Sequence, residues 1–211
     1  MSMRIVVDNT PGSHRPPTRA RRHAAGQAPI AFRAATSADA PALHALISSH
    51  LEEGHLLPRG MDELAVHAPR FVVAVQTARA SRSASKVERI VGCAELAPLS
   101  TGVAEVRSLV VDRDARKLGL GHHMVDDLGR RARLEGFDRL CAFAHDATFF
   151  IRLGFSIVPH TWVPEKIAHD CHSCPLFRNC GQYAVVLELR REHTQTGTAD
   201  LPQRSGMAPR A

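Results

Sequence analysis

The stretch AEVRSLVVDRDARKLGLG, residues Ala104–Gly121, decides the fold of this chain. Its first part alternates between polar and apolar residues and then becomes continuously apolar at Leu109–Val111. This pattern predicts a strand that is half-buried at its start and fully buried at its end. Two acidic residues, Asp112 and Asp114, follow directly and end the strand.

A glycine loop comes next. It reads RKLGLG and has two glycines, two residues apart, behind two cations. The apolar residues that follow recur every four positions and therefore form one face of a helix: Leu120, Met124, Leu128 and Ala132. Glycines before a helix N-terminus let an anion approach the free backbone N–H groups closely. The order predicts a phosphate-binding loop, although its spacing is neither that of a dinucleotide fingerprint nor that of a P-loop.

The loop spacing, read at Arg116, Gly119 and Gly121, matches the R/Q-x-x-G-x-G/A loop of the GNAT superfamily of N-acetyltransferases. Taken alone, a loop of this spacing is more often an ordinary strand-to-helix turn. The segment FFIRLGF, residues 149–155, also resembles the F-[FY]-x-x-x-G-F signature of that superfamily, and E-x-R-S-L-x-V stands upstream at 105–111. The chain therefore resembles GNAT proteins, which implies an α/β acyl-CoA N-acyltransferase fold with a mixed central sheet flanked by helices.

The chain has 211 residues, enough for one domain with a proper core. Its formal charge of +6 comes from the two ends, because residues 30–189 hold 18 basic and 18 acidic side chains. A neutral core with one Tyr and one Trp argues against nucleic acid as a partner. We expect a disordered basic leader (1–29), a GNAT domain (30–190) with a cysteine-rich insert (161–181), and a disordered tail (191–211).

Localisation follows from what the sequence lacks. No apolar run approaches the roughly 20 residues of a membrane helix, and the N-terminus has no secretory apolar region. The leader is Arg-rich and poor in acids, as a transit peptide also is, but Pro11, Pro16 and Pro17 disfavour an amphipathic helix. Five cysteines, three of them clustered, suit a reducing compartment. We expect a cytoplasmic protein without membrane partners, and a homodimer remains open.

Apolar periodicity gives the order of elements between residues 30 and 189. A helix is expected from Thr36, with Asp39 completing its N-terminal box and with Leu51 in its apolar stripe. A polar hairpin loop is expected at 78–88, and Gly92 indicates a bulge. The expected strands are 30–33, 71–75, 89–97, 105–111, 139–144, 155–158 and 183–189, and the further helices are 61–67, 120–136 and 147–153.

The resemblance implies acetyl-CoA as the donor, with its pyrophosphate on the N–H groups after the central strand and its pantetheine arm along that strand. A helix N-terminus adds roughly half a positive charge to such a site. The residues expected to bind the cofactor are Leu109, Val110, Val111, Arg116, Lys117, Leu118, Gly119, Leu120, Gly121, His122, Phe149 and Phe150.

Amide formation requires a stabilised oxyanion and a base that removes a proton from the amine. We expect the N–H of Val110 or Val111 to face the thioester carbonyl where the strand bulges or parts from its neighbour. Glu105 is the candidate base, and at period two its side chain shares a face with Arg107 and Leu109. The alternative for Glu105 is a strand glutamate that faces solvent.

The proton donor for the departing thiolate is not evident. Many GNAT members use a tyrosine at the position held here by Phe150. The only tyrosine in the chain is Tyr183, and no motif places it near the sulfur. Either water protonates the thiolate or it leaves as the anion, since the pKa of a thiol is about 8.5.

The segment VPEKIAHDCHSCPLFRNC, residues 163–180, resembles the pattern L-P-x-K-I-W-x-D-C-x-x-C-P-x-F-x-x-C. That pattern belongs to short bacterial amino-acid N-acetyltransferases of the N-acetylglutamate synthase type. Leu57-Pro58-Arg59 and the start of the central strand match the same group. The resemblance implies transfer of an acetyl group to the α-amine of L-glutamate, the first step of arginine biosynthesis.

An amino-acid acceptor needs cations for its carboxylates, and guanidinium binds a carboxylate through two hydrogen bonds. The candidates at positions that match the group are Arg59, Arg107 and Lys166, and the alternative for each is a surface salt bridge. Two positions depart from the pattern, Ala168 in place of the aromatic residue and Gly181-Gln182 in place of an acidic pair. Glutamine, another amino acid or another small amine is therefore an alternative acceptor.

Cys171, Cys174 and Cys180 contain one metal-ligand spacing but no second C-x-x-C. With a neighbouring histidine they could close a zinc site, and buried thiols that hold a loop together would look the same. No metal is expected, with zinc as the alternative. The competing function is a non-catalytic module that binds CoA or is stabilised by zinc.

Overall fold

The computed structural model describes residues 28–53, 56–79, 86–174 and 177–189. Within them a single sheet has seven strands: β1 (Ile30–Ala34), β2 (Phe71–Arg79), β3 (Lys86–Pro98), β4 (Val103–Val111), β5 (Arg139–Ala144), β6 (Ser156–Val158) and β7 (Tyr183–Glu188). The strand order is β1-β2-β3-β4-β5-β7-β6. Only β4 and β5 pair in parallel, and the other neighbours are antiparallel. The predicted mixed sheet is confirmed.

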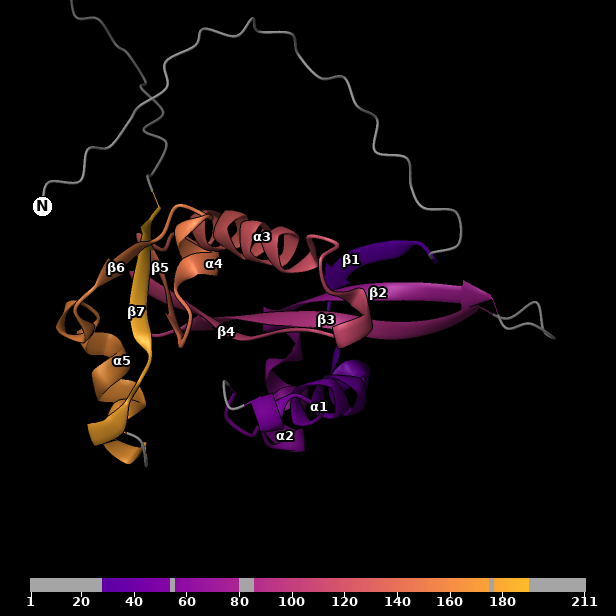
Figure 1. Ribbon diagram of the computed structural model, residues 1–211, viewed down its shortest axis with the longest axis horizontal. Coiled ribbons are helices and arrows are strands. Elements are labelled where there is room, and N and C mark those ends of the chain that lie inside the picture. Colours follow the sequence, from indigo (N-terminus) through magenta and orange to yellow (C-terminus); the bar gives the residue numbers. More distant parts are fainter. Residues whose placement is uncertain (1–27, 54–55, 80–85, 175–176, 190–211) are drawn as a thin grey trace, which may run out of the picture.

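Helices cover both faces of this sheet (Figure 1): α1 (Ala40–Ser48), α2 (Met61–His67), α3 (Leu120–Leu134), α4 (Thr148–Ile151) and α5 (Pro164–His169). The buried stripe of α3 packs with strand residues and with Phe150 and Phe155 in the largest apolar core. On the opposite face α1 and α2 pack with Val73, Cys93 and Val110 in a second core. The two cores hold β4 between them and so fix its position.

The start of the first helix follows the predicted local chemistry. The Asp39 carboxylate accepts hydrogen bonds from the Thr36 backbone N–H, at 2.8 Å, and from its hydroxyl, at 3.0 Å. The first turn is a 3-10 turn at Ser37–Asp39, and α1 then runs to Ser48. The expectation that Leu51 belongs to this helix was wrong, because α1 ends at Ser48 and Leu51 begins a separate 3-10 turn, η2 (Leu51–Glu53).

The other predicted elements are present, with changes at their ends. The strands predicted at 71–75 and 89–97 extend to Arg79 and from Lys86, so the hairpin is longer than its apolar core. The bulge indicated by Gly92 is confirmed, because Ala74 pairs with Gly92 and Val75 with Ile90, which leaves Val91 as the extra residue. A side chain at Gly92 would lie 3.3 Å from the Val110 carbonyl oxygen, so this position is tightly packed.

The segment 161–181 differs from the sequence prediction, and the predicted leader and tail lie outside the residues that the structure describes. No helix was expected within 161–181, but α5 lies there, starting at a proline that suits a first helical turn. The predicted leader lies outside the described residues up to residue 27, as does the predicted tail. The same holds for residues 80–85 of the hairpin loop. None of the helices in the described residues is long and apolar enough to cross a membrane.

Candidate active site

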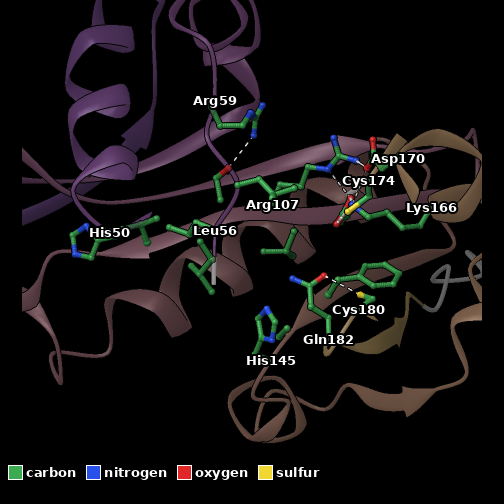
Figure 2. Close-up of a pocket in the computed structure, with 18 of the residues that line it drawn as sticks. His50, Leu56, Arg59, Arg107, His145, Lys166, Asp170, Cys174, Cys180 and Gln182 are labelled. Carbon is green, nitrogen blue, oxygen red and sulfur yellow. Dashed lines mark hydrogen bonds and ion pairs between the residues drawn. The ribbon is translucent and has the colours of Figure 1, made fainter. Parts of the chain in front are cut away.

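A cleft opens where β4 and β5 separate. The two strands pair only at Val103–Glu105 against Arg139–Cys141 and then diverge. The space between them is a cleft of about 860 Å³, lined by residues 105–111 of β4, the end of β5, α4, η2 and α5. Figure 2 shows His50 and Leu56 at one end and Lys166 and Asp170 at the other. The separation of a parallel pair thus creates the site.

A second irregularity lies on β4 itself. Cys93 pairs with Val110 and Glu95 with Arg107, so one residue of β3 lies opposite two of β4, Ser108 and Leu109. Ser108 has a left-handed backbone, with φ of 48°. The extra residue shifts the alternation of faces, so Leu109 packs against the α3 core as Val106 does. The expectation that Leu109 shares a face with Glu105 and Arg107 was therefore wrong.

The bulge also bears on the two candidate oxyanion donors. The Val110 N–H hydrogen-bonds toward the Cys93 sulfur, and the Asp112 N–H donates to the Val91 carbonyl, so both point to β3. Backbone N–H groups alternate along a strand. The Val111 N–H consequently points away from β3, toward the side on which β5 has separated.

The glycine loop has the backbone that its sequence suggested. Gly119 precedes α3 with φ of 80°, and Lys117 is also left-handed, with φ of 65°. Among the described residues, no atom beyond the immediate chain neighbours lies within 4 Å of where a Gly119 side chain would be, whereas a Gly121 side chain would lie 3.4 Å from the Phe149 ring. The first N–H groups of α3 have no partner within the helix. Open space beside unpaired N–H groups fits a bound phosphate.

Charged side chains around this loop are tied to η2. Arg116 donates to both oxygens of Glu53, at 2.9 and 2.8 Å, and to the Val111 carbonyl, at 3.2 Å. Arg113 also donates to Glu53, at 3.0 Å. Lys117 and Leu118 are exposed, and His122 lies 3.0 Å from Asp126 on the outer face of α3. Both predicted loop cations, Arg116 and Lys117, are exposed, and Arg116 is held by its ion pair with Glu53.

The aromatic residues after β5 close one wall of the cleft. Phe149 and Phe150 both line it, and Phe150 packs edge-on against Phe149 and Phe155, with ring centroids 5.1 and 5.2 Å apart. Tyr183 is half-exposed and is not among the described residues that line the cleft. His145, directly after β5, does line it. The sequence analysis missed His145, although a titratable residue at the end of a buried strand was a usable signal.

Arg59 contacts the bulge of β4 through a hydrogen bond to Ser108. Its guanidinium donates to Ser108 Oγ at 2.9 Å, to Glu95 Oε2 at 2.8 Å and to Glu63 Oε1 at 2.9 Å. The Glu95 side chain is only 1% exposed, and its other oxygen lies 3.4 Å from His67 Nδ1. Glu95 was missed by the sequence analysis, although a single acid within an apolar strand signals a buried ion pair. Arg59 thus lines the cleft with its hydrogen bonds largely committed to protein partners.

The other predicted substrate cations meet the predicted base. Glu105 is 3% exposed, and its carboxylate accepts from Lys166 Nζ at 2.7 and 2.9 Å and from Arg107 Nε at 2.6 Å. Asp170 Oδ2 accepts from Lys166 at 2.8 Å and from Arg107. We call these four side chains the charge cluster. Oε2 of Glu105 accepts two of these hydrogen bonds and Oε1 accepts one, so Oε1 keeps a second acceptor site for a proton donor.

Two pKa values follow from this arrangement. Burial acts to raise the pKa of Asp170, but hydrogen bonds from Lys166 and His169 and the charge of Arg107 outweigh it and hold that pKa at about 2. Burial acts to lower the pKa of Arg107, and the charges of Glu105 and Asp170 raise it overall. Asp170 was missed by the sequence analysis, although it lies four residues after Lys166, the spacing of a helical ion pair.

The cysteines fall into two groups. Cys93 in β3 and Cys141 in β5 are buried, and burial raises the pKa of the Cys93 thiol to about 12. The predicted zinc alternative consists of three residues that line the cleft as free thiols, Cys171, Cys174 and Cys180. In the described ranges, no three His, Cys, Asp or Glu side chains come together as a metal site.

Comparison with known proteins agrees with this geometry. The sequence profile of the acetyltransferase (GNAT) family matches residues 43–155, which is more than half of the chain and includes the cleft residues of β4, the glycine loop and α4. This chain belongs to the GNAT family. It is therefore an acetyltransferase of the GNAT type, and the predicted resemblance is confirmed.

Two curated GNAT relatives cover most of the chain. An uncharacterised N-acetyltransferase of Chlorobaculum tepidum is 28% identical over 157 residues, which are 74% of this chain and 95% of that protein. An amino-acid acetyltransferase of Mycobacterium tuberculosis is 29% identical over 146 residues, 69% of this chain and 79% of that protein. The GNAT chain is thus distantly similar to an amino-acid acetyltransferase.

Among solved structures, the N-acetylglutamate synthase of Neisseria gonorrhoeae, complexed with coenzyme A and N-acetyl-glutamate, is similar to this GNAT chain. The two agree with a TM-score of 0.63 and 26% identity over 78% of this chain. The match covers only 36% of the Neisseria chain, so this protein corresponds to about a third of the synthase. The neighbour's bound coenzyme A supports acyl-CoA binding in the GNAT fold shared by both.

Proposed function

We propose that this chain transfers an acetyl group from acetyl-CoA to the α-amine of an amino acid. One observation carries the proposal: a single cleft is lined at one end by Val111 and Arg116, directly before the glycine loop and the N-terminus of α3, and at the other end by the charge cluster. The first end suits a diphosphate, and the second suits a small molecule that bears charge. The similarity to an amino-acid acetyltransferase supports the choice of acceptor class.

The donor end is assigned to acetyl-CoA, which supplies the thioester when bound. The N–H groups of residues 117–122, with Arg116 and Lys117, hold the pyrophosphate, and Leu109 to Val111 line the pantetheine arm. Phe149 closes the wall beside Gly121, where a side chain would touch its ring. These residues fit the cofactor because the space next to Gly119 is open and its backbone is left-handed.

The chemical step needs three groups from the protein. The Val111 N–H stabilises the oxyanion, because it faces away from β3, whereas the Val110 N–H does not. Glu105 accepts the amine proton, directly or through water, at Oε1, which accepts a hydrogen bond from Lys166 and keeps a second acceptor site. His145, which lines the cleft, is the candidate donor for the thiolate, since an imidazole can release a proton near neutral pH.

L-Glutamate is the first acceptor to test, and its acetylation would place the enzyme at the start of arginine biosynthesis. L-Glutamine is the second candidate, and one observation favours it. The three predicted substrate cations contact four carboxylates, those of Glu63, Glu95, Glu105 and Asp170. In the described part of the cleft, these three cations thus already pair with carboxylates of the protein, which favours an acceptor whose side chain is uncharged.

The proposal is tested by mixing the full chain with acetyl-CoA and each of the twenty amino acids and measuring the release of CoA thiol. Turnover with glutamate or glutamine is expected. Binding of CoA in calorimetry without turnover of any amino acid would instead favour the non-catalytic module. The cytoplasmic location, the homodimer and the domain boundaries at residues 29 and 191 stay predictions.

A further inference from the structure

The four side chains of the charge cluster differ in how far they are exposed to the cleft, and this difference bears on the choice of acceptor. The Glu105 side chain is 4% exposed, that of Lys166 15%, that of Arg107 22% and that of Asp170 32%. All four residues line the cleft. Asp170 is therefore the most exposed member; Glu105 is buried, and Lys166 and Arg107 are partly buried.

The charges of the three deeper members do not cancel. Arg107 and Lys166 are cations, and Glu105 is the carboxylate between them, so together they carry one net positive charge. One further carboxylate balances that charge. Asp170 supplies it, since its Oδ2 contacts both cations. The place where an acceptor's side-chain carboxylate would pair with these cations is thus already taken by a carboxylate of the protein.

The position of Asp170 is fixed by the backbone. It follows the last residue of α5, and its N–H donates to the Lys166 carbonyl at 3.0 Å. Its second carboxylate oxygen lies 2.9 Å from His169 Nδ1. Its pKa is lowered to about 2, so it is charged near neutral pH. Asp170 therefore places a negative charge on the cleft wall at the pH of the acetyl-transfer assay.

We propose that Asp170 is a specificity-determining residue that selects acceptor amino acids with an uncharged, hydrogen-bonding side chain over acidic ones. The inference rests on the proposed amino-acid acetyltransferase activity. A glutamate side chain at this end of the cleft meets a second carboxylate, and the two like charges share one pair of cations. A glutamine side chain donates its amide N–H to the Asp170 carboxylate instead. Glutamine is therefore the better acceptor.

The first test uses the unaltered chain. The value of kcat/KM is measured for L-glutamine, for the γ-methyl ester of L-glutamate and for L-glutamate, at saturating acetyl-CoA. A close like charge is expected to lower kcat/KM for glutamate by about tenfold relative to the two uncharged acceptors. Glutamate used as well as glutamine, or better, would overturn the inference.

The second test changes the charge alone. Asp170→Asn keeps the shape of the side chain but removes its negative charge. The net positive charge of Glu105, Arg107 and Lys166 is then left to pair with the acceptor. The ratio of kcat/KM for glutamate to that for glutamine is expected to rise about tenfold. Asp170→Glu, which keeps the charge, is expected to stay near the original ratio. Asp127→Asn is the matched control, because Asp127 pairs with Arg130 on the outer side of α3.

The outcomes separate the two claims. Turnover of amino acids with a ratio that Asp170→Asn leaves unchanged overturns the inference alone. A rise in kcat/KM by the same factor for both acceptors also overturns it, because Asp170 would then only compete with a carboxylate common to all amino acids. Absence of turnover with every amino acid overturns the proposed function and, with it, the inference.

Discussion

The two ends of the cleft are built from different parts of the chain. The donor end consists mainly of backbone, the loop 116–121 and the first turn of α3, within a few consecutive residues. The acceptor end consists of side chains that meet across long sequence distances: Lys166 reaches Glu105 over 61 positions, and Asp170 reaches Arg107 over 63. The first end depends on local geometry and the second on tertiary packing.

Because of this difference, the donor end and the acceptor end of the cleft should respond differently to mutation. Backbone N–H groups persist whatever side chain they carry, so only a residue that cannot adopt the backbone conformation damages the donor end. A buried ion pair has no such tolerance, since the loss of one partner leaves the other unpaired and desolvated. Substitutions at the two ends should therefore affect acyl-CoA binding and acceptor use independently.

The largest effect is expected for Arg107→Ala. It leaves Glu105 and Asp170 sharing Lys166 alone, and truncating one partner of a buried pair costs about 2 to 3 kcal/mol, or roughly a hundredfold. We expect kcat/KM for the amino acid to fall by that factor, measured by thiol release, while calorimetry gives a CoA dissociation constant within about threefold of the original.

Arg130→Ala is the control for this substitution, because Arg130 lies on the exposed side of α3 and its side chain is 69% exposed. It should leave both constants unchanged. If Arg107→Ala weakened CoA binding as strongly as it weakened acceptor use, the two ends would not be independent.

The next effect is expected for Gly119→Ala. The left-handed φ of 80° makes any side chain unfavourable there by about 1 to 2 kcal/mol, although no atom lies nearby to clash. We expect a CoA dissociation constant about tenfold higher, measured by calorimetry, with the KM for the amino acid unchanged.

Gly136→Ala is a matched control at the opposite end of α3. Gly136 has φ of 87°, and its side-chain position is equally open. Both variants should lose similar thermal stability, while only Gly119→Ala loses affinity for CoA. Equal affinities in the two variants would refute the assignment of the glycine loop.

A smaller effect concerns acid stability. The pKa of Asp170 is lowered from 3.8 to about 2 in the folded chain, so this carboxylate stabilises the fold above about pH 4 and loses that contribution as the pH falls toward 2. After allowance for solvent screening, about 1 kcal/mol is involved. Unfolding by urea at pH 6 and at pH 3 should show a smaller acid-induced loss for Asp170→Asn than for the unaltered chain; equal losses would contradict the ion pairing.

The smallest effect is expected for Arg116→Ala. Its side chain is 45% exposed and pairs with Glu53, so it adds only screened attraction to a bound phosphate. We expect the CoA dissociation constant to rise about threefold at low salt and to depend less on ionic strength. A change as large as that of Gly119→Ala would mean that side-chain charge, rather than backbone, dominates the donor end.

The same contrast explains what the sequence could predict. The glycine loop, the two-phenylalanine motif and the order of strands and helices apart from α5 are specified by consecutive residues, and the sequence predicted them. A bulge or a parting of the central strand near Val110 was expected, but the alternating pattern did not place the extra residue at Ser108–Leu109, where it moves Leu109 to the opposite face. Local sequence specifies periodicity but does not say where a ladder gains an extra residue.

The acceptor end was predicted only as a set of residue types. Arg59, Arg107, Lys166 and Glu105 were named as separate candidates, and the structure brings the last three into one cluster completed by Asp170. The helix α5 was not predicted, because six residues with no buried side chain leave no apolar stripe. Partners more than 60 positions apart are set by tertiary packing, which a single sequence does not reveal.

The short pairing of β4 with β5 has a mechanical consequence. Strands β1 to β4 and strands β5 to β7 are joined through three residue pairs, and these lie at the start of β4, remote from the glycine loop. The two parts of the sheet therefore meet at Val103–Glu105 and diverge from there, and Lys166 contacts Glu105 across the gap between them. The angle between the two parts is set at this junction, where Ala104 and Leu140 are fully buried.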